Sequence, residues 1–71
     1  MEQFLIVIEP ANGNYSGYCP DLPGCIATGK TVEEVKQRMG EAIKIHLEGM
    51  REDNIPIPVI KSRAEYISLE L

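Results

Sequence analysis

The first apolar stretch of the chain is short and uninterrupted. Apolar residues fill positions 4–8, and three of the five are β-branched. A run of this length and composition predicts a strand that is buried on both faces. Asn12 and Gly13 then mark a hairpin turn. Residues 15–19 predict the returning strand, in which the small Gly17 indicates a bulge or close packing.

Two prolines and a glycine shape the connection that follows. Pro20, Pro23 and Gly24 break regular structure and predict a rigid loop. Beyond this loop, residues 25–28 predict a short third strand that Gly29 closes.

The longest pattern is helical and runs from Thr31 to about Asp53. Thr31 and Glu34 form a capping box, in which the threonine accepts from a free backbone amide and the glutamate reaches back. Apolar residues recur on one face at helical spacing, and charged residues occupy the other face. The apolar stripe consists of Val32, Val35, Met39, Ala42, Ile43, His46 and Met50. Asn54 can adopt the left-handed conformation that ends a helix, and Pro56 prevents its continuation.

The residues after the helix complete the expected order of elements. Residues 55–58 predict an extended stretch, and the alternation over residues 65–70 predicts a fourth strand. The sequence thus predicts a single α+β domain over residues 1–71. Its order is β-β-β-α-β, a small antiparallel-type sheet with one amphipathic helix on one face. Because one helix cannot cover both faces, we expect a homo-oligomer, a dimer or tetramer, to cover the other.

Charge and composition narrow the possible functions. The chain has 71 residues and a formal net charge of −4, and its seven Lys and Arg residues form no dense patch. Nucleic-acid binding depends on clustered cations, so we expect no direct binding by this chain alone. The apolar run at positions 4–8 is too short to cross a bilayer, and an acidic residue precedes it where a secretory leader needs positive charge. We therefore expect a cytoplasmic protein.

Candidate catalytic and metal-binding residues are few. His46 lies within the apolar stripe without a nucleophile beside it, which favours a core histidine bonded to a backbone carbonyl. Cys19 and Cys25 fall short of the four ligands of a structural zinc site, so we expect reduced, partly buried thiols. Whether they ever pair stays open. Glu9 and Asp21 are the only carboxylates that flank strand ends. We expect no enzyme, no metal and no cofactor.

Several motifs, taken together, resemble the HicB antitoxin family. They are Tyr15-x-Gly17-Tyr18, Pro20-Asp21-Leu22-Pro23-Gly24-Cys25, Thr28-Gly29-x-Thr31-x-Glu33-Glu34, Glu41-Ala42-Ile43, His46-Leu47-Glu48-Gly49 and Ile55-Pro56-Ile57-Pro58. The resemblance runs from Phe4 to about Pro58 and is specific, because the motifs share both order and spacing. Two positions depart from the family pattern: Lys30 stands where an acidic residue is common, and Asn54 where glycine is usual.

The resemblance implies a partial RNase H-like fold without that enzyme's catalytic acids. It also implies a HicA-like partner, a small basic toxin that cleaves messenger RNA and that the antitoxin of this type II toxin-antitoxin system neutralises. Many family members carry a C-terminal DNA-binding segment, and this chain resembles the toxin-binding domain alone, a short form. The alternative is a solitary regulatory or ligand-binding domain with the same fold and no toxin partner.

Candidate contacts with a partner come from position along the chain, not from the family. The rigid loop and the strand ends beside it suggest Tyr18 and Leu22 as apolar anchors. Asp21 and Glu9 are the corresponding candidate charge partners. For Leu22, a role in capping the core fits equally well.

Overall fold

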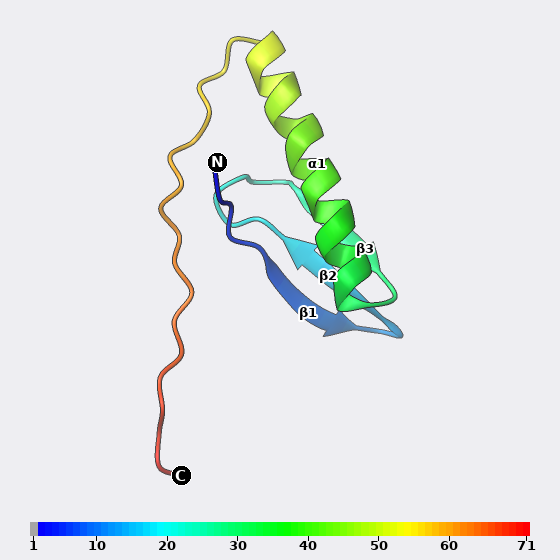
Figure 1. Cartoon of the computed structure of the whole chain (residues 1–71), viewed down its shortest axis with the longest axis vertical. Coiled ribbons are helices and arrows are strands. Elements are labelled where there is room, and N and C mark those ends of the chain that lie inside the picture. The colour runs from blue at the N-terminus through cyan, green and yellow to red at the C-terminus, as the bar shows by residue number, and fades with distance from the viewer. Residues whose placement is uncertain (1) are drawn as a thin grey trace.

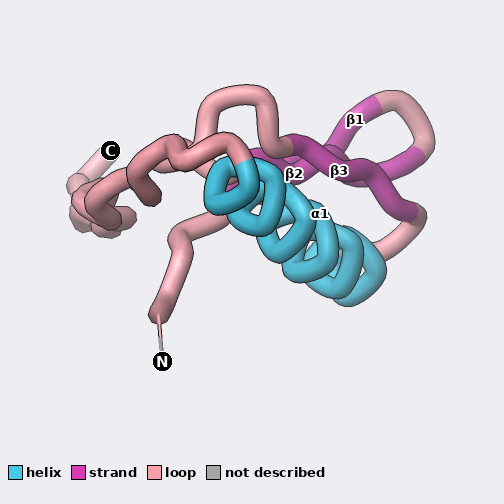
Figure 2. Tube along the Cα trace, turned by 90° about the horizontal axis from the view of Figure 1, so that it is seen from above, coloured by secondary structure: helices cyan, strands magenta, loops and turns pink. Residues whose placement is uncertain are grey.

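Three strands and one helix make up the regular structure of residues 2–71, the part of the chain that the computed structural model describes (Figure 1). The strands β1 (Val7–Ala11), β2 (Asn14–Tyr18) and β3 (Ile26–Gly29) form an antiparallel sheet in the order β1-β2-β3. The helix α1 (Val32–Glu52) packs along one side of the sheet (Figure 2). The predicted α+β class, with an antiparallel sheet and one helix on one face, is confirmed.

The first hairpin decides where β1 begins and ends. Asn12 and Gly13 form the turn, Gly13 at a φ of 75°, and they bring Ala11 opposite Asn14. The ladder then extends back to the pair Val7 and Tyr18. The strand therefore lies three residues later than the apolar run at positions 4–8 predicted. The reason is that pairing ends where β2 ends, which leaves residues 4–6 outside the ladder and half-buried.

Helix and sheet approach each other closely at Gly17. A Cβ atom at this position would lie 2.6 Å from Cγ1 of Val35 and 3.3 Å from Cγ of Met39. Both of these helical side chains are fully buried. The close-packing interpretation of Gly17 is thus confirmed, since only a residue without a side chain lets α1 lie this near to β2.

The two ends of α1 follow local sequence signals. Thr31 Oγ1 accepts from the Glu34 amide at 3.1 Å, and Glu34 Oε1 accepts from the backbone amide of Lys30 at 3.3 Å. Arg38 pairs with Glu34 at 3.1 Å and donates to the Thr28 carbonyl at 2.8 Å, which ties the first turns of the helix to β3. At the other end, Asn54 has a φ of 57°, the left-handed conformation expected of it.

The core is small and is completed by the loop between β2 and β3. Its buried apolar members are Cys19, Leu22, Cys25, Val35 and Met39. The loop folds back on itself through three backbone hydrogen bonds: Leu22 donates to Cys19, Cys25 to Leu22, and Cys19 to Cys25, all at 3.1–3.2 Å. This compact turn carries Leu22 into the interior, where it seals one end of the helix–sheet interface.

Residues 55–71, which we call the extended segment, form neither helix nor strand. The fourth strand predicted over residues 65–70 is therefore not formed within this chain, and that prediction was wrong. A strand requires a neighbouring backbone to satisfy its amides and carbonyls. Beyond Ser62 the chain runs away from the sheet instead (Figure 1), and its side chains lie in solvent.

The contact at Gly17 generates a prediction about stability. Gly17→Ala should destabilise the protein by about 1–3 kcal/mol, because the added methyl group overpacks the interface with Val35. Gly40→Ala is the matched control: it lies in α1 with open space around the new Cβ, and it should stabilise by about 0.5–1 kcal/mol. Urea unfolding followed by circular dichroism measures both. Equal effects of the two substitutions would contradict the close packing.

Candidate partner-binding surface

The side of the sheet opposite α1 is open. Because Gly17 faces the helix and successive side chains alternate along a strand, Ser16 and Tyr18 point to the opposite side. No helix or strand within residues 2–71 covers that side (Figure 2). We call it the open face.

Strand register divides the open face into two rows. Tyr18 of β2 is paired with Val7 of β1 and with Ile26 of β3, so these side chains form an apolar row. Directly opposed side chains in adjacent strands lie close enough to interact. Tyr18 is 41% exposed and Ile26 is 67% exposed, which leaves much of the row uncovered.

The second row is polar and lies beside the first. Ser16 of β2 is paired with Glu9 of β1 and with Thr28 of β3. Glu9 and Thr28 are exposed, and Ser16 between them is partly buried. An apolar strip flanked by polar side chains has the layout of a protein–protein contact, in which an apolar centre is surrounded by a polar rim.

Two of the four candidate contact residues lie on this face. Tyr18 is in the apolar row and Glu9 is in the polar row. Leu22 has no exposed surface and belongs to the core, so the prediction of a surface anchor is wrong for it and the core-capping alternative holds. Asp21 is only 8% exposed.

The carboxylate of Asp21 is engaged by its own chain. It accepts from Ser62 Oγ at 2.9 Å and from the Ser62 backbone amide at 3.3 and 3.4 Å to its two oxygens. In this conformation Asp21 holds the extended segment against the loop and is not placed to serve as the free charge partner that was expected. A contact between residues 41 positions apart could not be read from local pattern.

Sequence reasoning missed two apolar residues on this face, Val7 and the more exposed Ile26. For Ile26 the available signal was alternation within the third strand, where Cys25 is buried and Ile26 therefore lies on the other side. With only four residues in the strand, the pattern was too short to decide which face each side chain takes. Ile45, on the flank of α1, is exposed to almost the same extent as Ile26, 68% against 67%.

His46 of α1 is half-buried and lies beside Ile45. It helps to line a shallow hollow of about 290 Å³ with Cys25, Ile26 and Ile45. The hydrogen bonds described for residues 2–71 include none from its imidazole, so the expected bond to a backbone carbonyl is not formed.

Two broader features bear on chemistry and location. In the described part of the chain, no three His, Cys, Asp or Glu side chains gather closely enough to hold a metal ion. The one helix among residues 2–71 is not apolar enough over its length to span a membrane.

Comparison with known proteins identifies relatives across almost the whole chain. A family model described as HicB_like antitoxin of bacterial toxin-antitoxin system matches residues 4–70. An uncharacterized 14.9 kDa protein of Haemophilus phage HP1 is 40% identical over 63 residues, which is 89% of this chain and 47% of the phage protein. A UPF0150 protein of Thermoplasma acidophilum is 33% identical over 69 residues, 97% of each. The chain thus spans about half the length of the phage relative and nearly all of the archaeal one.

A solved structure shares the fold. A chain of the HicA3 and HicB3 toxin-antitoxin complex superposes with a TM-score of 0.63 and 28% sequence identity. The match covers 76% of this chain and 66% of the solved one. Three antiparallel strands followed by one helix are therefore the architecture of a HicB-like neighbour as well as of this protein.

The two cysteines have an environment that protects their thiols. Cys19 and Cys25 are free and buried, at 2% and 4% exposure. Burial, followed by the neighbouring Cys19 thiol, raises the pKa of Cys25. Since the thiolate is the reactive form, both features slow the chemistry of this residue.

We predict that both thiols react with a disulfide reagent at neutral pH far more slowly in the folded protein than in urea, while an added Ser68→Cys reacts at once. Rapid, stoichiometric labelling of native protein would contradict this burial.

The pKa of Cys25 also predicts how stability depends on pH. Because this pKa is higher in the folded chain, the Cys25 thiol ionises first in the unfolded chain. The free energy of unfolding should therefore fall as pH rises above the ordinary thiol range.

Proposed function

The chain belongs to the HicB-like antitoxin family, and on that premise we propose that it binds a small basic HicA-like toxin and neutralises it by covering its surface. The toxin, by the resemblance, cleaves messenger RNA. The role proposed for the chain is protein binding and not catalysis. The observation that carries the proposal is the uncovered apolar row of the open face, formed by Val7, Tyr18 and Ile26.

An aromatic side chain between two aliphatic ones suits the centre of an interface. Binding energy concentrates in a few apolar and aromatic anchors that become fully desolvated, and tyrosine is among the residues most often found in that role. The backbone of Tyr18 is paired on both sides, so little backbone freedom is lost when a partner covers it. Ile26, on the edge strand, extends the same strip.

Charge supports a basic partner. The formal net charge of −4 opposes that of a basic toxin, and Glu9 places one carboxylate beside the apolar row. Complementary charge mainly accelerates encounter and enforces partner choice, while the apolar anchors determine how long the complex lasts. In this proposal the toxin is not modified: it is inactive for as long as it is covered.

Substitutions on the open face test the proposal. Tyr18→Ala and Ile26→Ala should each weaken binding to the toxin encoded beside this protein's gene by at least about thirtyfold, or roughly 2 kcal/mol, as expected for central anchors. Ile55→Ala is the control: it truncates an exposed isoleucine, at 48%, just after the C-terminal end of α1 and away from the open face, so it should leave affinity unchanged. Titration calorimetry with the purified toxin measures affinity, and rescue of growth on co-expression measures neutralisation.

Circular dichroism of each variant separates loss of binding from loss of folding. Equal weakening by Ile26→Ala and Ile55→Ala would exclude the open face as the contact. If the wild-type chain neither binds nor protects against any neighbouring toxin, the antitoxin function fails, and the solitary regulatory domain takes its place.

A further inference from the structure

The last nine residues of the extended segment have the pattern of a strand but no partner. Ile67, Leu69 and Leu71 alternate with Ser68 and Glu70, so an extended backbone places the apolar side chains on one face. All of them are exposed in this chain, at 80%, 71% and 115% for the three apolar residues. Together with Tyr66, at 103%, they form a concentration of uncovered apolar surface that one isolated chain leaves in water.

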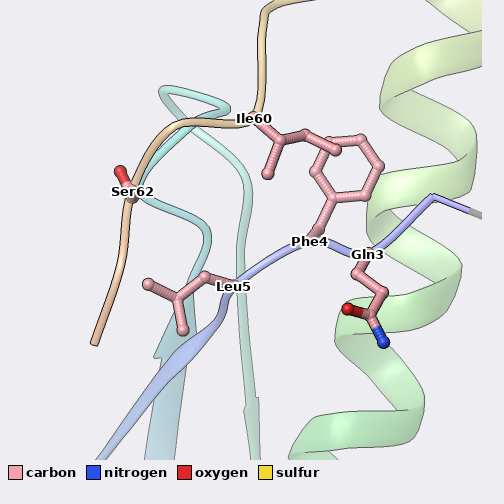
Figure 3. Close-up of a pocket in the computed structure, with 5 residues that line it drawn as sticks. All are labelled: Gln3, Phe4, Leu5, Ile60 and Ser62. Carbon is pink, nitrogen blue, oxygen red and sulfur yellow. The ribbon is translucent and has the colours of Figure 1, made fainter. Parts of the chain in front are cut away.

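The first part of the extended segment is attached to the body. Figure 3 shows Ile60 directed toward the ring of Phe4, with Ser62 further along the same segment. A hollow of about 500 Å³ lies between the segment and residues 3–5, where no strand pairing occurs. The hydrogen bonds from Ser62 to Asp21 fix the point of departure, and residues 63–71 are exposed from there onward.

The sheet has a free edge that fits such a strand. β1 is at the border of the sheet, and its Pro10 pairs with Tyr15. A proline is tolerated in a ladder when its nitrogen faces the free side, and backbone groups alternate in direction, so Ile8 directs its N–H and C=O to the free side too. The opposite border is partly occupied, because Arg38 donates to the carbonyl of Thr28 in β3.

The apolar side chains of β1 and those of residues 63–71 can lie on the same side of the sheet. Ile8 is paired with Gly17, which places it on the helix side of the sheet, where it and Ile6 pack against the core but remain half-exposed. A strand added to β1 with Ile67 and Leu69 on that side would continue the same apolar layer. Both components, the unpaired strand and the unpaired edge, belong to one chain.

We infer that residues 63–71 of one copy pair with the outer edge of β1 in a second copy, and that the second copy reciprocates. Within one chain the bonds to Asp21 hold Ser62 at the loop, and the segment then runs away from its own β1 (Figure 1). A reciprocal exchange uses the same two elements twice and closes a two-fold dimer. It places two copies of Ile67 and Leu69, which are 80% and 71% exposed in one chain, against the apolar layer of the helix side. This inference does not rest on the proposed toxin.

Light scattering after size exclusion tests the exchange. The wild-type chain should have about twice its monomer mass of 7.9 kDa. The double variant Ile67→Pro, Ser68→Pro should have the monomer mass. Adjacent residues of a strand direct their N–H groups to opposite edges, so one of the two prolines always removes an N–H that would donate to β1. The matched variant Ile67→Val, Ser68→Thr keeps both donors and should remain a dimer. The helical circular dichroism of all three should agree, since these positions contact no part of the core.

A cross-link identifies which surfaces meet. In the exchanged strand Glu70 lies on the same side of the sheet as Glu9, because side chains alternate and Leu69 takes the helix side. When a tagged Glu70→Cys chain is mixed with an untagged Glu9→Cys chain, a short bismaleimide should join the two into a product of mixed mass. A wild-type monomer would overturn the inference, and so would a dimer that survives the double proline variant. A Glu70→Cys, Glu9→Cys chain that cross-links only within itself would show that the segment returns to its own β1, which also overturns it.

Discussion

The absence of a side chain at Gly17 is the constraint on which the rest of this structure depends. A methyl group there would stand 2.6 Å from Val35, so α1 reaches β2 only because position 17 is glycine. The contact fixes which side of the sheet is covered. With Gly17 directed at the helix, Tyr18 must lie on the other side, and register then places Val7 and Ile26 beside it.

A single helix covers a single face, and both contacts proposed for this chain use what the helix leaves uncovered. Small domains bury a limited fraction of their surface, which makes additional contacts with other chains a source of stability. Two unpartnered features of different character remain. One is the apolar row of the open face, which suits a folded partner, and the other is the edge of β1, which suits an extended strand. Because the two features use different groups of the sheet, side chains in one case and backbone in the other, both can be occupied at once.

Local signals in the sequence were sufficient for the helix, the hairpin and the fold class. Thr31 and Asn54 act at the ends of α1 as their side chains and conformations predict, because capping involves residues only three or four positions apart. The resemblance to HicB antitoxins is confirmed by a family match over residues 4–70. What sequence did not yield depends on how the loop closes, on a distant contact and on the shortness of one strand. Leu22 is buried because of how its loop closes, and Asp21 is occupied by Ser62, 41 positions away. Ile26 was missed because four residues are too few to assign a face.

The central claim is that the open face receives the partner. Isoleucine methyl spectra test it directly, because the chain carries Ile26 on the open face, Ile55 just after α1 and Ile43 against the core. On addition of the proposed HicA-like toxin, the account predicts that the Ile26 methyl resonance shifts or broadens while those of Ile43 and Ile55 stay in place. A shift of Ile43 or Ile55 with no change at Ile26 would contradict it and would move the contact away from the open face.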